Sequence, residues 1–153
     1  MKIKKILVLT CLILGLFNTL KASDNVESTL EDLLTCTKGW GSISQSDLNT
    51  RFNNHNLTYT PKSEMKIFGG NLTSFSPFAG MSPGVSAVID LNFETAKKNL
   101  EEKNNIIFDE CEQTKYSQHC SKKISRTQTF IIYTSVPETK EGVMILCALP
   151  FRK

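Results

Sequence analysis

The sequence predicts an α+β domain with a mainly antiparallel sheet, on one side of which an N-terminal helix pair and one further helix pack. Apolar residues recur at helical spacing near the N-terminus and again after residue 92, whereas the other segments show the alternation or apolar runs of strands. Hairpin connections are expected between two pairs of strand segments, at residues 69–71 and 136–141. Four cysteines lie outside the first 22 residues, and we expect them to form two disulfides.

Residues 1–22 have the pattern of a secretory signal peptide. Three of the first five residues are lysine, and the apolar run from Ile6 to Phe17 follows them. We place the cleavage after Ala22. The run is too short to cross a bilayer, so no membrane span is expected once the signal is removed. Residues 23–153 are then expected to form a single α+β domain.

Removal of the signal peptide also changes the charge. The whole chain has 18 Lys+Arg and 15 Asp+Glu, and four lysines leave with the signal, so 14 basic residues face 15 acidic ones. A formal charge of −1 offers no basic surface to a polyanion, and we expect no nucleic-acid partner.

The expected compartment is the periplasm of a diderm bacterium, with secretion as the alternative. The short lysine- and isoleucine-rich leader and the many Asn and Lys residues are typical of a low-GC bacterial chain. Paired cysteines fit the oxidising periplasm. The sequons that begin at Asn56 and Asn71 leave a eukaryotic secretory path open.

Two helices are expected before the sheet. Residues 25–36 place apolar side chains along one helical face. A shorter helix begins at the capping box of Ser44 and Asp47, and we expect the asparagine-rich residues 53–56 to end it. Trp40, between two glycines, is interpreted as a lid on the core rather than a platform for a ligand.

Strands are expected from residue 57 onward. Residues 57–60, 65–68 and 72–75 are rich in β-branched and aromatic side chains, and Gly69-Gly70-Asn71 is interpreted as a hairpin turn. Strict alternation over residues 85–91 predicts a strand with one buried face.

The remaining elements are a helix over 93–103 capped by Asn92, a short strand at 106–108 and a polar loop over 109–123. The strongest strand patterns, 127–135 and 142–149, are separated by a hairpin loop at 136–141. Their apolar residues are continuous, which predicts central strands covered on both faces.

Four cysteines allow three pairings. Cys111 and Cys120 are separated by eight residues that form an easily closed loop, so we pair them, which leaves Cys36 with Cys147. Both of the latter lie on apolar faces, and their bond would join the first helix to the last strand. The spacing contains no Cys-x-x-Cys, so we expect no metal and no other cofactor.

Catalysis has little support, and we expect a protein that is not an enzyme. There is no Gly-x-Ser-x-Gly motif, and paired cysteines leave no free thiolate. The carboxylates Asp109, Glu110 and Glu112 leave a small cell-envelope hydrolase as an alternative, which would require Asp109 or Glu112 to lie in a cleft opposite Asp90.

The expected activity is therefore binding. Phe75, Phe78 and Met81 lie on a loop stiffened by Pro and Gly, and Tyr116 lies on the loop held by the short disulfide. These four residues are the candidate contacts to a partner, expected to be another envelope or secreted protein, although Phe75 and Phe78 could instead fold back on the core. We expect an inhibitor or immunity-type protein. A further alternative is an envelope-assembly or lipid-carrying module with a dry cavity between sheet and helices.

Overall fold

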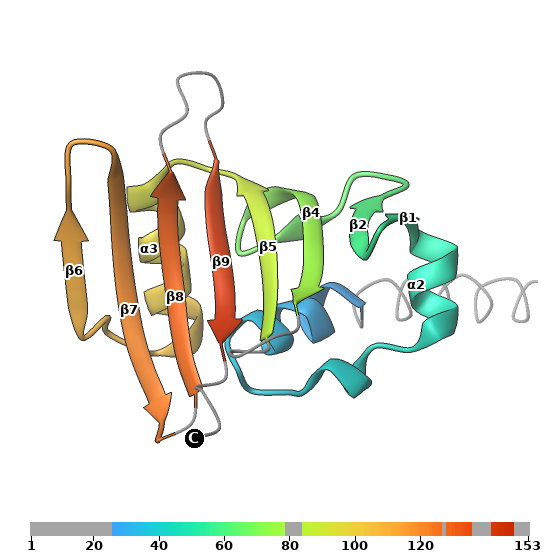
Figure 1. Ribbon diagram of the computed structural model, residues 1–153, viewed down its shortest axis with the longest axis horizontal. Coiled ribbons are helices and arrows are strands. Elements are labelled where there is room, and N and C mark those ends of the chain that lie inside the picture. Colours follow the sequence, from blue (N-terminus) through green and yellow to red (C-terminus); the bar gives the residue numbers. More distant parts are fainter. Residues whose placement is uncertain (1–25, 79–83, 127, 136–141, 149–153) are drawn as a thin grey trace, which may run out of the picture.

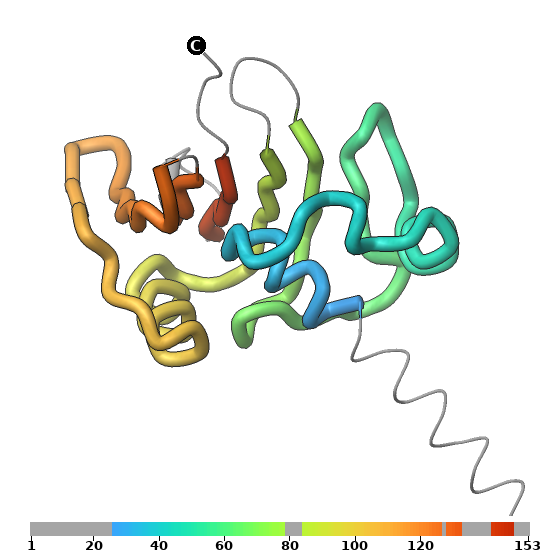
Figure 2. Tube along the Cα trace, turned by 90° about the horizontal axis from the view of Figure 1, so that it is seen from below, coloured from blue at the N-terminus to red at the C-terminus, as the bar shows by residue number. Residues whose placement is uncertain are grey.

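The computed structural model describes residues 26–78, 84–126, 128–135 and 142–148 of the protein. The expected signal peptide and the expected loop at 136–141 lie outside these residues. Within them, the fold is α+β, as the sequence predicted, and every strand pairing of its nine-stranded sheet is antiparallel. Helix 26–34 and helix α3 (Phe93–Asn104) lie on the same face of the sheet (Figures 1 and 2).

The strands in chain order are β1 (Phe52–His55), β2 (Thr58–Pro61), β3 (Lys66–Ile67), β4 (Gly70–Phe78), β5 (Gly84–Asp90), β6 (Glu110–Gln113), β7 (Ser117–Ser125), β8 (Gln128–Ser135) and β9 (Val143–Ala148). Their order across the sheet is β1-β2-β4-β5-β9-β8-β7-β6, and β3 pairs with β4 beside this path. The two strands with the strongest sequence pattern, β8 and β9, are adjacent near the middle of the sheet, as expected.

The helix starts follow the capping signals in the sequence. Ser44 Oγ accepts a hydrogen bond of 3.0 Å from the Asp47 amide at the start of α2 (Gln45–Arg51). Asn92 Oδ1 accepts one of 2.9 Å from the Thr95 amide at the start of α3. Asn105 ends α3 in the left-handed conformation. Both capping predictions are confirmed.

The first helix is tied to two distant segments through Glu31. Its Oε1 accepts a 2.7 Å hydrogen bond from the Phe68 amide, and its Oε2 pairs with the Lys103 ammonium. This carboxylate therefore joins helix 26–34 to the β3–β4 turn and to the last turn of α3.

The expected end of the second helix at residues 53–56 is wrong. Helix α2 ends at Arg51 and β1 begins at Phe52, because the Phe52 ring packs into the core, 4.9 Å from the Phe75 ring centroid. Asn56 and Leu57, both at positive φ, then form the two-residue turn to β2.

The β3–β4 turn lies one residue earlier than expected. Ile67 pairs with Gly70, so Phe68 and Gly69 form the turn, at φ values of 49° and 83°. Phe68 tolerates the left-handed conformation because its side chain is buried and its amide is bound by Glu31.

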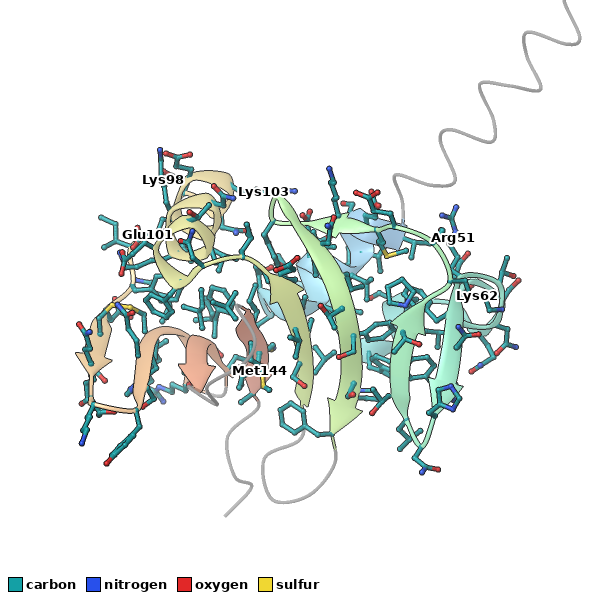
Figure 3. The ribbon with its side chains drawn as sticks, turned by 90° about the horizontal axis from the view of Figure 1, so that it is seen from above. Arg51, Lys62, Lys98, Glu101, Lys103 and Met144 are labelled. Atoms are coloured by element: carbon teal, nitrogen blue, oxygen red, sulfur yellow. A yellow bond between two sulfur atoms is a disulfide. The ribbon has the colours of Figure 1, made fainter. Side chains whose placement is uncertain are left out.

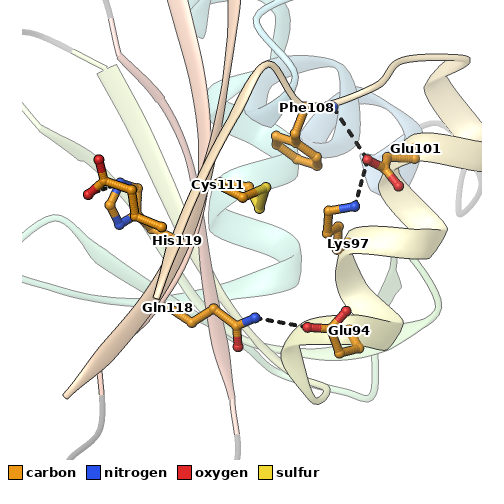
Figure 4. The surroundings of a disulfide bond; sticks show 9 residues. Glu94, Lys97, Glu101, Phe108, Cys111, Gln118 and His119 are labelled. Carbon is orange, nitrogen blue, oxygen red and sulfur yellow. Dashed lines mark hydrogen bonds and ion pairs between the residues drawn. A yellow bond between two sulfur atoms is a disulfide. The ribbon is translucent and has the colours of Figure 1, made fainter. Parts of the chain in front are cut away.

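Residues 106–108 do not form a strand, and residues 109–123 are not a loop. The first segment is an irregular connection, whereas most of the second is the hairpin β6–β7. Its polar sequence carries no apolar alternation; pairing with β8, the Cys111–Cys120 disulfide and a 2.8 Å hydrogen bond from Gln118 Nε2 to Glu94 Oε1 hold it in place (Figure 4).

Both expected disulfides are confirmed. Cys36–Cys147 joins the end of the first helix to β9, and Cys111–Cys120 joins β6 to β7. Cys36 and Cys147 are each only 6% exposed, so the longer bond runs through the core. The core lies between the sheet and the two helices, with Leu30, Ile89 and Phe130 among its fully buried members.

Glu101 on α3 holds the irregular connection of residues 106–108 against the helix. Replacement of the Glu101 carboxylate gives a first prediction. Its Oε1 accepts hydrogen bonds from Lys97 Nζ (2.9 Å) and from the Phe108 amide (3.3 Å), and the Lys97 bond lowers the pKa of Glu101 below its usual 4.5 (Figure 4). We expect Glu101→Gln to lower the free energy of unfolding at pH 7 by about 1 kcal/mol.

The sign of the pH dependence follows from that lowered pKa. A carboxyl with a lowered folded pKa stabilises the protein above its unfolded pKa, and the contribution is lost as the pH falls through the folded value. Urea unfolding of both proteins at pH 7 and in steps below pH 4.5 should therefore show the difference shrinking with acid. A difference that does not change with pH would contradict the assignment.

Candidate binding surfaces

The face of the sheet opposite the helices carries an apolar patch. Val88 on β5 is paired with Met144 on β9, and Leu146 on β9 is paired with Ile131 on β8. All four side chains are half-buried, and no described helix covers them. Figure 3 shows Met144 on the side of the sheet opposite Lys98, Glu101 and Lys103 of α3. We call these four residues the open-face patch.

This result corrects one expectation. The continuous apolar runs of β8 and β9 predicted cover on both faces, but among the described residues only one face is covered. On that face Phe130, Ile132 and Val143 are completely buried, whereas Ile131 and Leu146 of the open face keep contact with solvent.

Polar residues flank the patch on both sides. Ser74 and Ser86 lie next to it toward β4, and His119 and Ser121 lie beyond β8 on β7, as the register requires. An apolar centre with a polar surround is the usual composition of a protein–protein interface.

The β1–β2 hairpin stands out on the same side as the patch (Figures 2 and 3). Leu57 at its tip is 60% exposed and has a φ of 66°, a conformation in which a two-residue hairpin turn normally places glycine. Asn54 Oδ1 accepts a 3.0 Å hydrogen bond from the Leu57 amide and fixes the turn. The protein thus holds a large apolar side chain in a strained, exposed position.

The four partner contacts predicted from the sequence do not lie together on one exposed surface. Phe75 is completely buried and stacks on Tyr59 with ring centroids 4.9 Å apart, so its assignment as a partner contact is wrong. It lies in the middle of β4 because the strand continues beyond the point where the loop was expected to begin.

The other three candidates do not form one surface. Phe78 is half-buried at the end of β4, and Met81 lies outside the described residues. Tyr116 is 68% exposed in the β6–β7 turn, with the Lys115 ammonium 5.4 Å from its ring centroid. Sequence reasoning missed the open-face patch and Leu57; the apolar run of β8 and β9 was the available signal for the patch.

The carboxylates of the hydrolase alternative are not gathered in a cleft. Asp109 Oδ1 is 2.7 Å from Lys122 Nζ, and this hydrogen bond holds the pKa of Asp109 below its usual value. The Glu112 side chain is 71% exposed and 3.8 Å from His119 Nε2. Asp90 is also exposed, and β9, β8 and β7 lie between its strand and that of Glu112. This arrangement gives no support to the hydrolase alternative.

A pocket of about 320 Å³ lies at one end of the sheet, next to the buried disulfide. Its lining includes Leu33 of the first helix, Trp40, Phe78 and Val85. Phe52, Tyr59 and Phe75 form an aromatic cluster in the core. Trp40 packs on this aromatic cluster, 6.1 Å from Tyr59 and 6.0 Å from Phe75 between ring centroids. It therefore closes the core, as the sequence suggested, and also forms one wall of a pocket.

Three further observations bear on the class of protein. Among the described residues, no group of His, Cys, Asp and Glu side chains could hold a metal ion. In the same part of the chain no helix is long and apolar enough to cross a membrane. Two disulfides are consistent with an extracytoplasmic, oxidising compartment.

The chain matches no protein-family model, no characterised protein and no solved structure.

Proposed function

We propose that this chain is an exported, non-catalytic module that binds another envelope or secreted protein through the open face of its sheet. The observation that carries the proposal is the open-face patch on β5, β9 and β8. Apolar strand residues on both faces are the sequence pattern of a sheet covered on both sides. Since one face is covered by helices of this chain, the other is the surface for a partner.

The β1–β2 hairpin supports the same interface. Leu57 lies at the tip of this hairpin and occupies a left-handed conformation that costs a non-glycine residue about 1 kcal/mol or more. Backbone strain of this kind clusters at functional sites. Phe52 of β1 and Tyr59 of β2 pack against each other in the core and fix the base of the hairpin. The tip therefore loses little conformational freedom when a partner binds.

The expected compartment also supports the proposal. The signal-like residues 1–22 and the two disulfides support export to a bacterial periplasm, where an inhibitor or immunity-type protein would meet its target.

The test is affinity purification from a periplasmic extract of the source cells with three forms of the mature protein. We expect one envelope or secreted protein to be enriched with the unchanged chain. Its retention should fall at least about tenfold with Ile131→Lys/Leu146→Lys, since central apolar contacts carry most interface energy. Lys98→Glu on the outer side of α3, where Lys98 is 71% exposed, is the matched control and should retain the partner.

A lysine on the open face can extend its ammonium to solvent, so we expect the double variant to fold. Thermal unfolding checks this. Equal retention of the partner by the double variant and by the control would overturn the proposed interface.

A further inference from the structure

The pocket beside the Cys36–Cys147 disulfide lies away from the open-face patch. It is bounded by the end of helix 26–34, by Trp40 in the short 3-10 helix (Trp40–Ser42) and by the ends of β4, β5 and β9. The residues that face it are mainly apolar: Leu33, Trp40, Pro77, Phe78 and Val85. A pocket of about 320 Å³ is large enough for a small molecule.

Two features hold the pocket walls in place. The disulfide fixes the end of the first helix to β9, and Cys147 itself lines the pocket. Gly84 allows Phe78 to approach: a Cβ at Gly84 would lie 2.5 Å from Phe78 Cζ and 2.1 Å from the Cys147 carbonyl oxygen. The aromatic ring thus lies over a glycine of the neighbouring strand. Such a preformed pocket loses little freedom when a ligand binds.

The charge and the aromatic side chains of the pocket indicate which kind of ligand it favours. Among the described lining residues the charged one is Lys38, and its Nζ lies 2.7 Å from Asp32 Oδ2. The positive charge is therefore already balanced, so an anionic head group would gain little there. Two aromatic walls, Trp40 and Phe78, favour stacking or edge contacts with another ring.

We infer that this pocket binds a neutral, compact aromatic molecule of one to two fused or linked ring systems. The inference does not rest on the proposed protein interface, because none of the four residues of the open-face patch is among the described residues that line the pocket.

Trp40, the chain's single tryptophan, provides a direct readout. The probe is N-phenyl-1-naphthylamine, added to the mature protein with both disulfides intact. We expect saturable binding of one probe per chain, with a matching fall in Trp40 emission through energy transfer. The sulfonated analogue 8-anilinonaphthalene-1-sulfonate, which has the same rings and a negative charge, should bind at least tenfold more weakly.

Two variants on the same strand locate the probe. Val85→Phe places a larger side chain into the pocket and should weaken binding at least tenfold, whereas Val88→Phe enlarges a residue of the open face and should leave binding unchanged. Val85 is only 5% exposed, so a larger side chain at this position can disturb folding. Amide chemical shifts of the unchanged protein therefore provide a second measurement. Probe-induced shifts should cluster at Leu33, Trp40 and Phe78.

Absence of saturable binding would overturn the inference. Equal affinity for the anionic analogue, or shifts centred on Val88 and Leu146, would overturn it as well. None of these results would bear on the protein interface, which is tested separately by retention of the partner.

Discussion

Replacement of both Cys36 and Cys147 by alanine is expected to lower the free energy of unfolding by about 5 kcal/mol. The two residues are 111 positions apart, so their bond restricts most of the unfolded chain. Both side chains are also nearly buried between the first helix and β9. For a domain of this size such a loss approaches the whole stability, and we expect a largely unfolded population at 37 °C.

The second disulfide is the matched control. Cys111 and Cys120 are nine positions apart, and the same loop-entropy argument gives about 3 kcal/mol for their replacement by alanine. Denaturant unfolding of the two double variants should rank them in this order. Equal losses, or a larger loss at the hairpin, would show that the Cys36–Cys147 bond does not hold the fold together as described.

Phe75→Ala is expected to lower the free energy of unfolding by about 4 kcal/mol. The ring is completely buried, stacks on Tyr59 and meets Phe52 edge to face, both with centroids 4.9 Å apart. Its removal leaves a cavity at the centre of the aromatic cluster that Trp40 closes. Urea unfolding, with Trp40 emission as the signal, measures both the loss and the loosening of the cluster.

Tyr116→Ala is the control, because that ring is 68% exposed and should change the free energy of unfolding by less than about 0.5 kcal/mol. If Phe75→Ala were equally mild, Phe75 would be a surface residue, as its interpretation as a partner contact required, and the position of β4 would be wrong.

Local signals made much of this fold predictable. The capping residues Ser44 and Asn92 fixed two helix starts, and the alternation over residues 85–91 located β5. The cysteine pairing followed from loop length and from the apolar faces of Cys36 and Cys147. For the helix starts and for β5 the information lies within a few neighbouring residues, whereas the Cys36–Cys147 pair followed by elimination once Cys111 and Cys120 were paired.

The errors arose where distant contacts override the local pattern. Residues 110–113 and 117–125 are polar and carry no strand periodicity, but pairing with β8 and a disulfide make them strands. Phe75 stands close to a series of turn-forming residues, which suggested a loop, whereas Tyr59 and Phe52 from other strands bury it.

The candidate site was predictable only in part. The apolar run of β8 and β9 was visible, but which of its two faces the helices leave uncovered depends on the packing of the whole chain. Leu57 gave no signal, because its exposed position in the β1–β2 turn results from the early end of α2 at Arg51.

The most direct test of the protein interface is site-specific photo-crosslinking in the source cells. A photoreactive amino acid is placed at position 146 on the open face or at position 98 on the outer side of α3. The interface predicts a crosslink to one exported protein from position 146 and none from position 98. A crosslink to the same protein from position 98, with position 146 left unreacted, would contradict it.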